Sequence, residues 1–242
     1  MSGSLISSES SSKVLLTWAN SVDGSLSSEV GRPTPLSCHE SMVFTHKLRA
    51  SHDGILIGIG TVRADNPSLT VRLCKGESPT PIVIDPKLRI PLHSKIIESA
   101  KLRKVCLLGN SFFESDNDVL ERKRVLEDLG AVVLFCPPLQ DRNEEIDLKV
   151  AIRLLREEMG ISKVMVEGGQ RVLRSFVLQH LLMKEQHMGK LVDQVIVTVS
   201  PKLILGGVTL GLGYPSGLSN PLELQNVTWS ILGSDAVLEG TL

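Results

Sequence analysis

The sequence is poor in aromatic residues, which make up 3% of its 242 residues. Single-stranded nucleic acids are bound on aromatic side chains that line basic grooves, so this composition disfavours a nucleic-acid-binding protein. The formal net charge of −1 points the same way, because nucleic-acid and anionic-membrane binders normally carry a positive field. Any anionic ligand must therefore be held by local groups.

Cysteines are few, and Cys38, Cys74, Cys106 and Cys136 include no close pair. This spacing indicates neither a zinc ribbon nor a disulfide scaffold, and free thiols fit a reducing, cytoplasmic location. The histidines form no His-Glu-x-x-His motif, and His39-Glu40 lacks the Pro-Cys-x-x-Cys partner of zinc deaminases. We therefore expect no metal site. Phosphate loops of the Gly-Lys-Ser/Thr type and Gly-x-Ser-x-Gly elbows are also absent.

Long apolar runs are missing as well, so the sequence predicts neither a membrane span nor a membrane partner. Residues 1–12 are rich in serine and lack the basic start and apolar stretch of a secretory signal. We expect residues 1–12 to form a disordered tail and residues 13–242 to form one domain, because no repeat or long linker divides them.

Short apolar runs alternate with amphipathic stretches along the chain, which predicts an α/β fold with a mostly parallel sheet and helices on both faces. The expected strands are 14–18, 55–59, 82–84, 105–108, 132–135, 164–166 and 195–199, and the expected helices are 119–129, 148–159 and 170–183. Ser37 and Glu40 have capping-box spacing, which predicts a further helix that ends near Ala50. After a Gly- and Pro-rich loop at 206–221, runs at 227–232 and 237–238 predict an antiparallel hairpin.

Two glycine motifs follow expected strands. Gly58-Ile59-Gly60-Thr61 would let a ligand approach the backbone, but Arg63 stands where a dinucleotide fingerprint has its third glycine, so a structural turn fits equally well. Val166-Glu167-Gly168-Gly169 places a carboxylate at a strand end before a helix, where α/β sheets bind ligands. Glu167 as a surface or capping carboxylate is the alternative.

Charged residues gather around Asp65-Asn66-Pro67, with Arg63, Arg72 and Arg49 nearby. The planar guanidinium fork suits phosphate, although a solvated charged loop is the alternative for each arginine. Asp23-Gly24 has the composition of a plain turn. From the residues alone, the sequence indicates an α/β enzyme that binds a nucleotide.

Taken together, three segments resemble the reductase family of riboflavin biosynthesis in order and spacing. They are Trp18 to Gly24, Leu48-Arg49, and Asp53 to Arg72, which contains Gly-Thr-Val-Arg-Ala-Asp-Asn-Pro. The similarity continues through Pro81 to Asp85, Val164 to Gly169 and Val199 to Gly207. It runs from about Leu15 to the C-terminus, and the length is similar to that of the fungal and archaeal single-domain form.

The resemblance implies a dihydrofolate-reductase-like fold, NADPH as cofactor, a homodimer, and 2,5-diamino-6-ribosylamino-4(3H)-pyrimidinone 5′-phosphate as substrate. By the same resemblance, NADPH would contact Thr61, Asp65, Gly168, Gly169, Gln170, Arg171 and Val172. The substrate would lie among Arg49, Leu69, Arg72 and Glu167, with Glu167 and Asp23 as candidate catalytic residues. Lys87, Arg89 and Asn110 are candidates for contact with the cofactor's 2′-phosphate.

Two alternatives stay open. A pterin-type reductase could share the fold, and a nucleotide-binding regulator without turnover could share the glycine turns. The zinc deaminase domain of bacterial relatives has no counterpart in the sequence, so we expect no deaminase activity.

Overall fold

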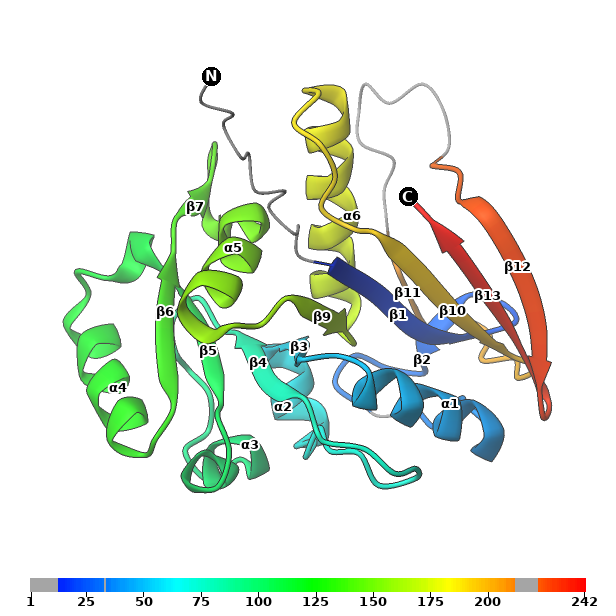
Figure 1. The fold of residues 1–242 in the computed structure, drawn as a ribbon, viewed down its shortest axis with the longest axis horizontal. Helices are drawn as coiled ribbons and strands as arrows, with labels where there is room; N and C mark the ends of the chain where they lie inside the picture. Colours follow the sequence, from blue (N-terminus) through cyan, green and yellow to red (C-terminus); the bar gives the residue numbers. More distant parts are fainter. Residues whose placement is uncertain (1–12, 33, 212–221) are drawn as a thin grey trace, which may run out of the picture.

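The computed structural model describes residues 13–32, 34–211 and 222–242. Its main feature is a nine-stranded sheet with the order β12-β13-β10-β1-β9-β3-β4-β5-β6 (Figure 1). The strands are β1 (Lys13–Ser21), β3 (Gly54–Gly58), β4 (Thr80–Ile84), β5 (Cys106–Asn110), β6 (Val132–Cys136), β9 (Lys163–Val166), β10 (Gln194–Ser200), β12 (Gln225–Leu232) and β13 (Asp235–Thr241). From β10 to β6 all neighbours run parallel, and β13 and β12 add an antiparallel hairpin at one edge.

Helices cover both faces of the sheet, as the alternating pattern predicts. They are α1 (His39–Ala50), α2 (Ile59–Asp65), α3 (Lys95–Glu98), α4 (Asn117–Asp128), α5 (Leu148–Met159) and α6 (Gln170–Glu185), with 3-10 turns η1 (Ser99–Lys101) and η2 (Ser111–Phe113). Apolar residues of α5 and α6 pack against Leu16, Leu56 and Val166 of the sheet. The opposite face carries Leu15, Ile55 and Val83, which α1, α2, α3 and α4 cover.

Two small antiparallel pairs lie outside the main sheet. One joins β2 (Ser25–Ser27) to β11 (Val208–Thr209), and the other joins β7 (Pro138–Leu139) to β8 (Arg142–Ile146). The sequence did not predict these strands, because two or three residues are too few to show a period-2 pattern and β8 is largely polar. Part of the expected loop at 206–221 lies outside the described residues, and so does the expected tail at 1–12.

The start of α1 differs from the capping-box prediction. Cys38 is the N-cap residue, and neither Ser37 nor Cys38 caps the helix with its side chain. The N–H of Cys38 instead donates to Oδ2 of Asp235 at 2.8 Å, from a strand 197 positions later in the chain. Asp235 therefore accepts the N–H that the glutamate of a capping box would accept, and no side chain takes the part of the serine. The expected end of the helix at Ala50 is confirmed.

Ile59 is also placed differently from the prediction. It was expected to end a strand, but β3 ends at Gly58 and Ile59 begins α2. Seven residues give α2 too few turns for a helical period to be read from sequence. Because α2 begins at Ile59, Gly60, the second glycine of the first motif, lies in a helix directly after the carboxyl end of β3.

Candidate functional site

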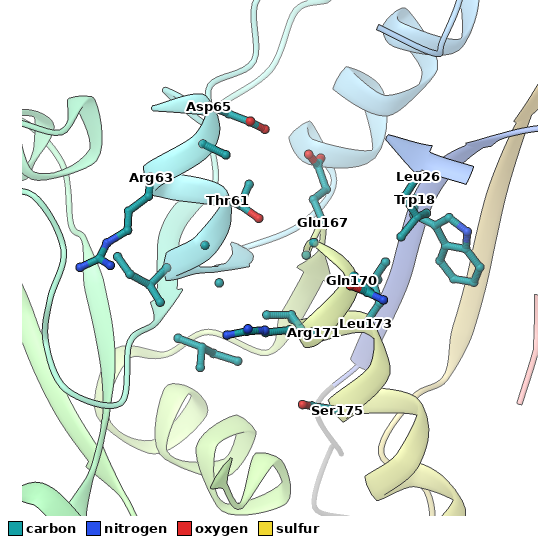
Figure 2. A pocket seen from close by; sticks show the side chains of 18 of the residues that line it. Trp18, Leu26, Thr61, Arg63, Asp65, Glu167, Gln170, Arg171, Leu173 and Ser175 are labelled. Atoms are coloured by element: carbon teal, nitrogen blue, oxygen red, sulfur yellow. The ribbon is translucent and has the colours of Figure 1, made fainter. Parts of the chain in front are cut away.

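A cavity of about 1010 Å³ opens where several parallel strands end. Residues from the carboxyl halves or ends of β1, β3, β4 and β9 line it, together with α2, β2 and the first turns of α6. Open α/β sheets bind ligands at this edge, because helices begin there and loops are free to vary. Figure 2 shows Thr61, Asp65 and Glu167 on one side of the cavity and Trp18 and Leu26 on the other.

The two glycine motifs meet in the wall of this cavity. A Cβ added to Gly169 would lie 3.0 Å from Oγ1 of Thr61, so the turn before α6 closely approaches the start of α2. A Cβ added to Gly60 would meet no atom within 4 Å, and Gly60 lines the cavity. The missing side chains therefore leave open space on one side and allow close packing on the other, as a cradle for a ligand requires.

The N-terminus of α6 points its free amides toward the same space. Gly169 is the N-cap residue, and no side chain caps the helix. Gly168, Gly169, Gln170, Arg171 and Val172, all predicted from the sequence to bind a cofactor, line the cavity. Uncapped N–H groups at the positive end of a 16-residue helix are a ready anion site, which suits a diphosphate.

Glu167 lies directly after β9 and forms a two-pronged ion pair with Arg49 of α1. Nε of Arg49 donates to Oε1 at 2.7 Å, and Nη2 donates to Oε2 at 2.6 Å. Both side chains are largely buried, with 15% and 16% exposed. Burial lowers the pKa of Arg49, but the hydrogen bond and charge of Glu167 raise it overall, so the guanidinium stays charged. Glu167 lines the cavity whereas Arg49 stands behind it.

Thr61 and Asp65 project from α2 into the cavity, where Figure 2 shows them near Glu167. Partial burial raises the pKa of Asp65 above its ordinary value. These are two further residues for which the sequence predicted cofactor contact. Their separation by one turn of helix places both on the cavity side of α2.

Leu69 and Arg72 lie beyond α2 in a segment without helix or strand. Leu69 is 4% exposed and belongs to the apolar cluster of Val62 and Ile97. The N–H of Arg72 donates to Nδ1 of the buried His46 at 2.9 Å, and Nη1 of Arg49 donates to the carbonyl of Thr70 at 3.2 Å. Neither Leu69 nor Arg72 lines the cavity, but this network connects their segment to Glu167.

Asp23, the other candidate catalytic residue, is not among the residues that line the cavity. It accepts hydrogen bonds from Oγ of Ser21 and from the N–H groups of Ile204 and Leu205. The bond from Ser21 makes the largest contribution to the lowered pKa of Asp23. Asp23 thus ties the turn before β2 to the loop that leads into β11.

Basic side chains line the cavity at the end of β4. Arg63, Lys87 and Arg89 contribute to this wall, and Nη2 of Arg63 donates to the carbonyl of Arg89 at 3.0 Å. Lys87 lies 3.7 Å from a carboxylate oxygen of Glu144 and 4.4 Å from the ring centre of Phe113. Within the described residues, Arg63 and Arg89 have no carboxylate within 4.0 Å. Asn110 instead uses its amide internally, as donor to Asn143 and acceptor from Phe112.

Sequence reasoning missed several parts of the site. Trp18 appeared only as the end of a strand and within the resemblance, whereas it lines the cavity; in Figure 2 it lies beside Leu26, with its ring directed away from Glu167. Glu144 and Glu145 reach the cavity from β8, which has no sequence signal. His46 could have been suspected from its position three residues before Arg49, on the same side of a helix. In the described part of the chain, no three His, Cys, Asp or Glu side chains are grouped to hold a metal ion.

No helix within the described ranges is long and apolar enough to cross a membrane.

Comparison with known proteins shows the family to which the chain belongs. Residues 12–238 match the RibD C-terminal domain family. The chain is 31% identical to the 2,5-diamino-6-ribosylamino-4(3H)-pyrimidinone 5′-phosphate reductase of Saccharomyces cerevisiae, over 93% of this chain and 84% of that protein. It is 29% identical to the riboflavin biosynthesis protein RibD of Aquifex aeolicus, over 93% of this chain and 56% of that protein. The chain therefore spans little more than half of that longer relative.

A solved structure supports the fold. The riboflavin biosynthesis reductase Rib7 of Saccharomyces cerevisiae superposes with a TM-score of 0.72 at 27% identity, covering 96% of this chain and 90% of that one. The expected α/β fold, with a mostly parallel sheet and a C-terminal antiparallel hairpin, is confirmed. Because the match spans nearly the whole sequence and the relatives are reductases of riboflavin biosynthesis, this chain belongs to the RibD C-terminal domain family.

Proposed function

We propose that this protein is an NADPH-dependent reductase that converts the ribosylamino group of 2,5-diamino-6-ribosylamino-4(3H)-pyrimidinone 5′-phosphate to a ribitylamino group. The observation that carries the proposal is the single cavity in which a helix N-terminus suited to phosphate adjoins the Glu167–Arg49 ion pair. The similarity to reductases with this printed activity supports the choice of substrate.

The cradle of the two glycine motifs fits a dinucleotide. Backbone N–H groups of Gln170 and Arg171 would hold the diphosphate, and Thr61 and Asp65 would flank the nicotinamide half. When bound, NADPH supplies the hydride for the reduction. Val172 also lines the cavity, and its side chain fills the space next to Gly58 and Gly168.

The substrate is proposed to lie against Glu167, with Arg72 near its 5′-phosphate and Leu69 supporting the segment that carries Arg72. During ring opening of the ribosylamine a proton must reach the ring oxygen, and reduction at C1′ leaves the exocyclic nitrogen as an amine. Glu167 would orient the sugar and assist this proton movement, and Arg49 would hold the carboxylate in place. Leu26 would exclude water on the opposite side.

Asp23 has a different place in the proposal. Because its oxygens accept three hydrogen bonds and it lies outside the cavity wall, we assign it the task of fixing β2 and β11 beside the site.

Oxidation of NADPH on addition of the phosphorylated aminopyrimidine tests the proposal directly. We expect a fall in NADPH absorbance with this substrate and none with dihydrofolate, which separates the proposed reaction from that of a pterin-type reductase. A protein that binds NADPH but oxidises it with neither compound would be a regulator instead.

The basic wall at the end of β4 predicts preference for NADPH over NADH. Arg63 and Arg89 would meet the 2′-phosphate with charge-assisted hydrogen bonds, which contribute about 1.5 to 3 kcal/mol each. Arg89→Gln should therefore lower kcat/KM for NADPH by roughly tenfold, and leave that for NADH unchanged. Equal kcat/KM values for the two cofactors in the unmodified protein would contradict this assignment.

A further inference from the structure

The segment from Ser68 to Arg72 is held almost entirely by side chains from elsewhere in the fold. Ser68 and Leu69 offer their carbonyls to the guanidinium of Arg103, and the carbonyl of Thr70 accepts from Arg49. The N–H of Val71 donates to Oγ of Ser78 at 3.0 Å, and the N–H of Arg72 donates to Nδ1 of His46 at 2.9 Å. Without a helix or strand, these bonds set the path of the backbone.

That path includes a costly conformation. Leu69 has a φ of 51°, in the left-handed region that a leucine seldom adopts. Such a residue stays in place only while its surroundings hold it there. Loss of one of the hydrogen bonds around it should therefore loosen the whole segment and not one contact alone.

His46 has a defined protonation state in this arrangement. Its side chain is buried, with 3% of the residue exposed, and Nδ1 is the acceptor of a backbone N–H. A neutral imidazole with Nδ1 as acceptor carries its proton on Nε2. Protonation of Nδ1 would set two donors against each other and place a third positive charge beside Arg49 and Arg72.

We propose that His46 is a positioning residue for the substrate site, because its neutral imidazole fixes the 68–72 segment. This segment carries Arg72, and its Thr70 carbonyl accepts a hydrogen bond from Arg49. The inference rests on the proposed function, in which Glu167 contacts the substrate, Arg49 holds Glu167 in place, and Arg72 lies near the 5′-phosphate. Of the four side chains that hold the segment, His46 alone has an ordinary pKa between 5 and 8. Among these four side chains, only protonation of His46 should therefore loosen the segment as the pH falls.

The surroundings of His46 set the direction of this effect. Burial lowers its pKa first of all, the charges of Arg49 and Arg72 lower it further, and Glu167 opposes them. The neutral form is therefore favoured in the folded protein. The hydrogen bond from Arg72 to His46 should be intact above pH 6.5, the ordinary pKa of histidine, and should be lost only at a lower pH.

Two variants separate positioning from simple packing. His46→Asn keeps an acceptor, since Oδ1 of asparagine can take the place of Nδ1, but it cannot be protonated in this pH range. His46→Leu removes the acceptor and leaves the N–H of Arg72 unpaired. We expect His46→Leu to raise KM for the phosphorylated aminopyrimidine by about tenfold, and His46→Asn to stay within about threefold of the unmodified protein.

The pH profile is the decisive readout. For the unmodified protein, kcat/KM should fall as one proton binds at a pH below 6.5, and the same fall should be missing in His46→Asn. The substrate phosphate also titrates near pH 6, but it does so with both proteins, so their ratio isolates His46. If the pH profiles of the unmodified protein and of His46→Asn were parallel, the proposal would be overturned. It would also be overturned if His46→Leu raised the dissociation constant of NADPH as much as the KM of the substrate.

A measurement on the free protein distinguishes failure of this inference from failure of the proposed function. In an NMR titration, the backbone amide of Arg72 should shift with the same midpoint as the imidazole of His46. If the midpoint of the Arg72 amide differs from that of the His46 imidazole, then His46 does not hold the segment, and this result does not depend on enzymatic activity. If the unmodified protein never oxidises NADPH, the proposed function fails, and the titration still decides whether His46 holds the segment.

Discussion

At the scale of single residues, the ion pair of Arg49 and Glu167 offsets the free-energy cost of burying two charges with two strong hydrogen bonds. Removing two charges from water is unfavourable, and the fork-to-carboxylate geometry at 2.6 and 2.7 Å compensates only while both partners are present. The pair also connects α1 to the end of β9, across 118 positions of sequence. Glu167 can therefore have a fixed orientation in the cavity without a bound ligand.

Glu167→Gln should fold and bind NADPH but turn over much more slowly. The amide keeps the shape of the side chain and loses its charge, so one of the two strong hydrogen bonds to Arg49 is lost. A loss of about 1.5 to 3 kcal/mol corresponds to roughly a ten- to hundredfold lower kcat. Steady-state kinetics and NADPH titration measure the two effects separately.

Glu158→Gln is a matched control, since Glu158 is an exposed carboxylate on α5 away from the cavity, and its kinetics should be unchanged. If Glu167→Gln turned over at the unmodified rate at saturating substrate, Glu167 would have a structural role and no part in the reaction.

At the scale of elements, α1 depends on a cap that comes from the far end of the chain. Asp235 on β13 is fully buried, and its Oδ2 accepts the N–H of Cys38. Burial by itself raises the pKa of Asp235, but hydrogen bonds from Cys38, Ser41 and Ser234 lower it overall. The carboxylate thus joins the C-terminal hairpin to the helix that carries His46 and Arg49.

Asp235→Ala should lower the free energy of unfolding by about 1.5 to 3 kcal/mol, because it removes a hydrogen bond to a charged group. The pKa of Asp235 is lower in the folded protein than in the unfolded chain. The stabilisation by its carboxylate is therefore complete above the unfolded-state pKa and is lost as the pH falls through the folded-state pKa. Urea unfolding at pH 7 and at pH values below 4 measures the difference.

Ser234→Ala removes only the neighbouring hydroxyl, 3.3 Å from Oδ1 of Asp235, and should cost less. A stability difference between Asp235→Ala and the unmodified protein that stays constant down to low pH would mean that the carboxylate charge plays no part.

At the scale of the whole molecule, the hairpin edge of the sheet leaves an apolar surface open. Val227, Trp229 and Ile231 alternate along β12 and are 42%, 62% and 72% exposed. In register, Trp229 lies beside Leu238, which lies beside Val197, which lies beside Trp18. An apolar stripe therefore crosses β12, β13, β10 and β1, which lie side by side in Figure 1, and its outer end on β12 is exposed.

We expect a homodimer in which this stripe is covered by a second copy of the chain, in agreement with the family resemblance. Trp229→Asp should shift the protein to monomer at micromolar concentration, as measured by analytical ultracentrifugation. Thr228→Asp is the matched control, because the neighbouring residue points to the other face of β12. A monomeric unmodified protein, or a dimer that survives Trp229→Asp, would contradict the prediction.

The sequence by itself determined the local features. The parallel strands were predicted from short apolar runs, and α4, α5 and α6 from the period of their apolar residues; the bounds of α5 agree at both ends. The two glycine motifs and Glu167 were singled out because they follow strands directly, where α/β sheets bind ligands. Periodicity and strand-end position are properties of neighbouring residues, so they can be read without knowing the fold.

Only the tertiary structure decided which side chains meet. The pairing of Arg49 with Glu167, the bond from Arg72 to His46 and the cap from Asp235 to Cys38 join residues 118, 26 and 197 positions apart. No local pattern encodes such contacts, because they depend on strand order and on how each helix crosses the sheet. The capping-box prediction was wrong for this reason: the N–H of the N-cap residue Cys38 donates to a buried carboxylate on a distant strand, and not to a glutamate of the helix's own first turn.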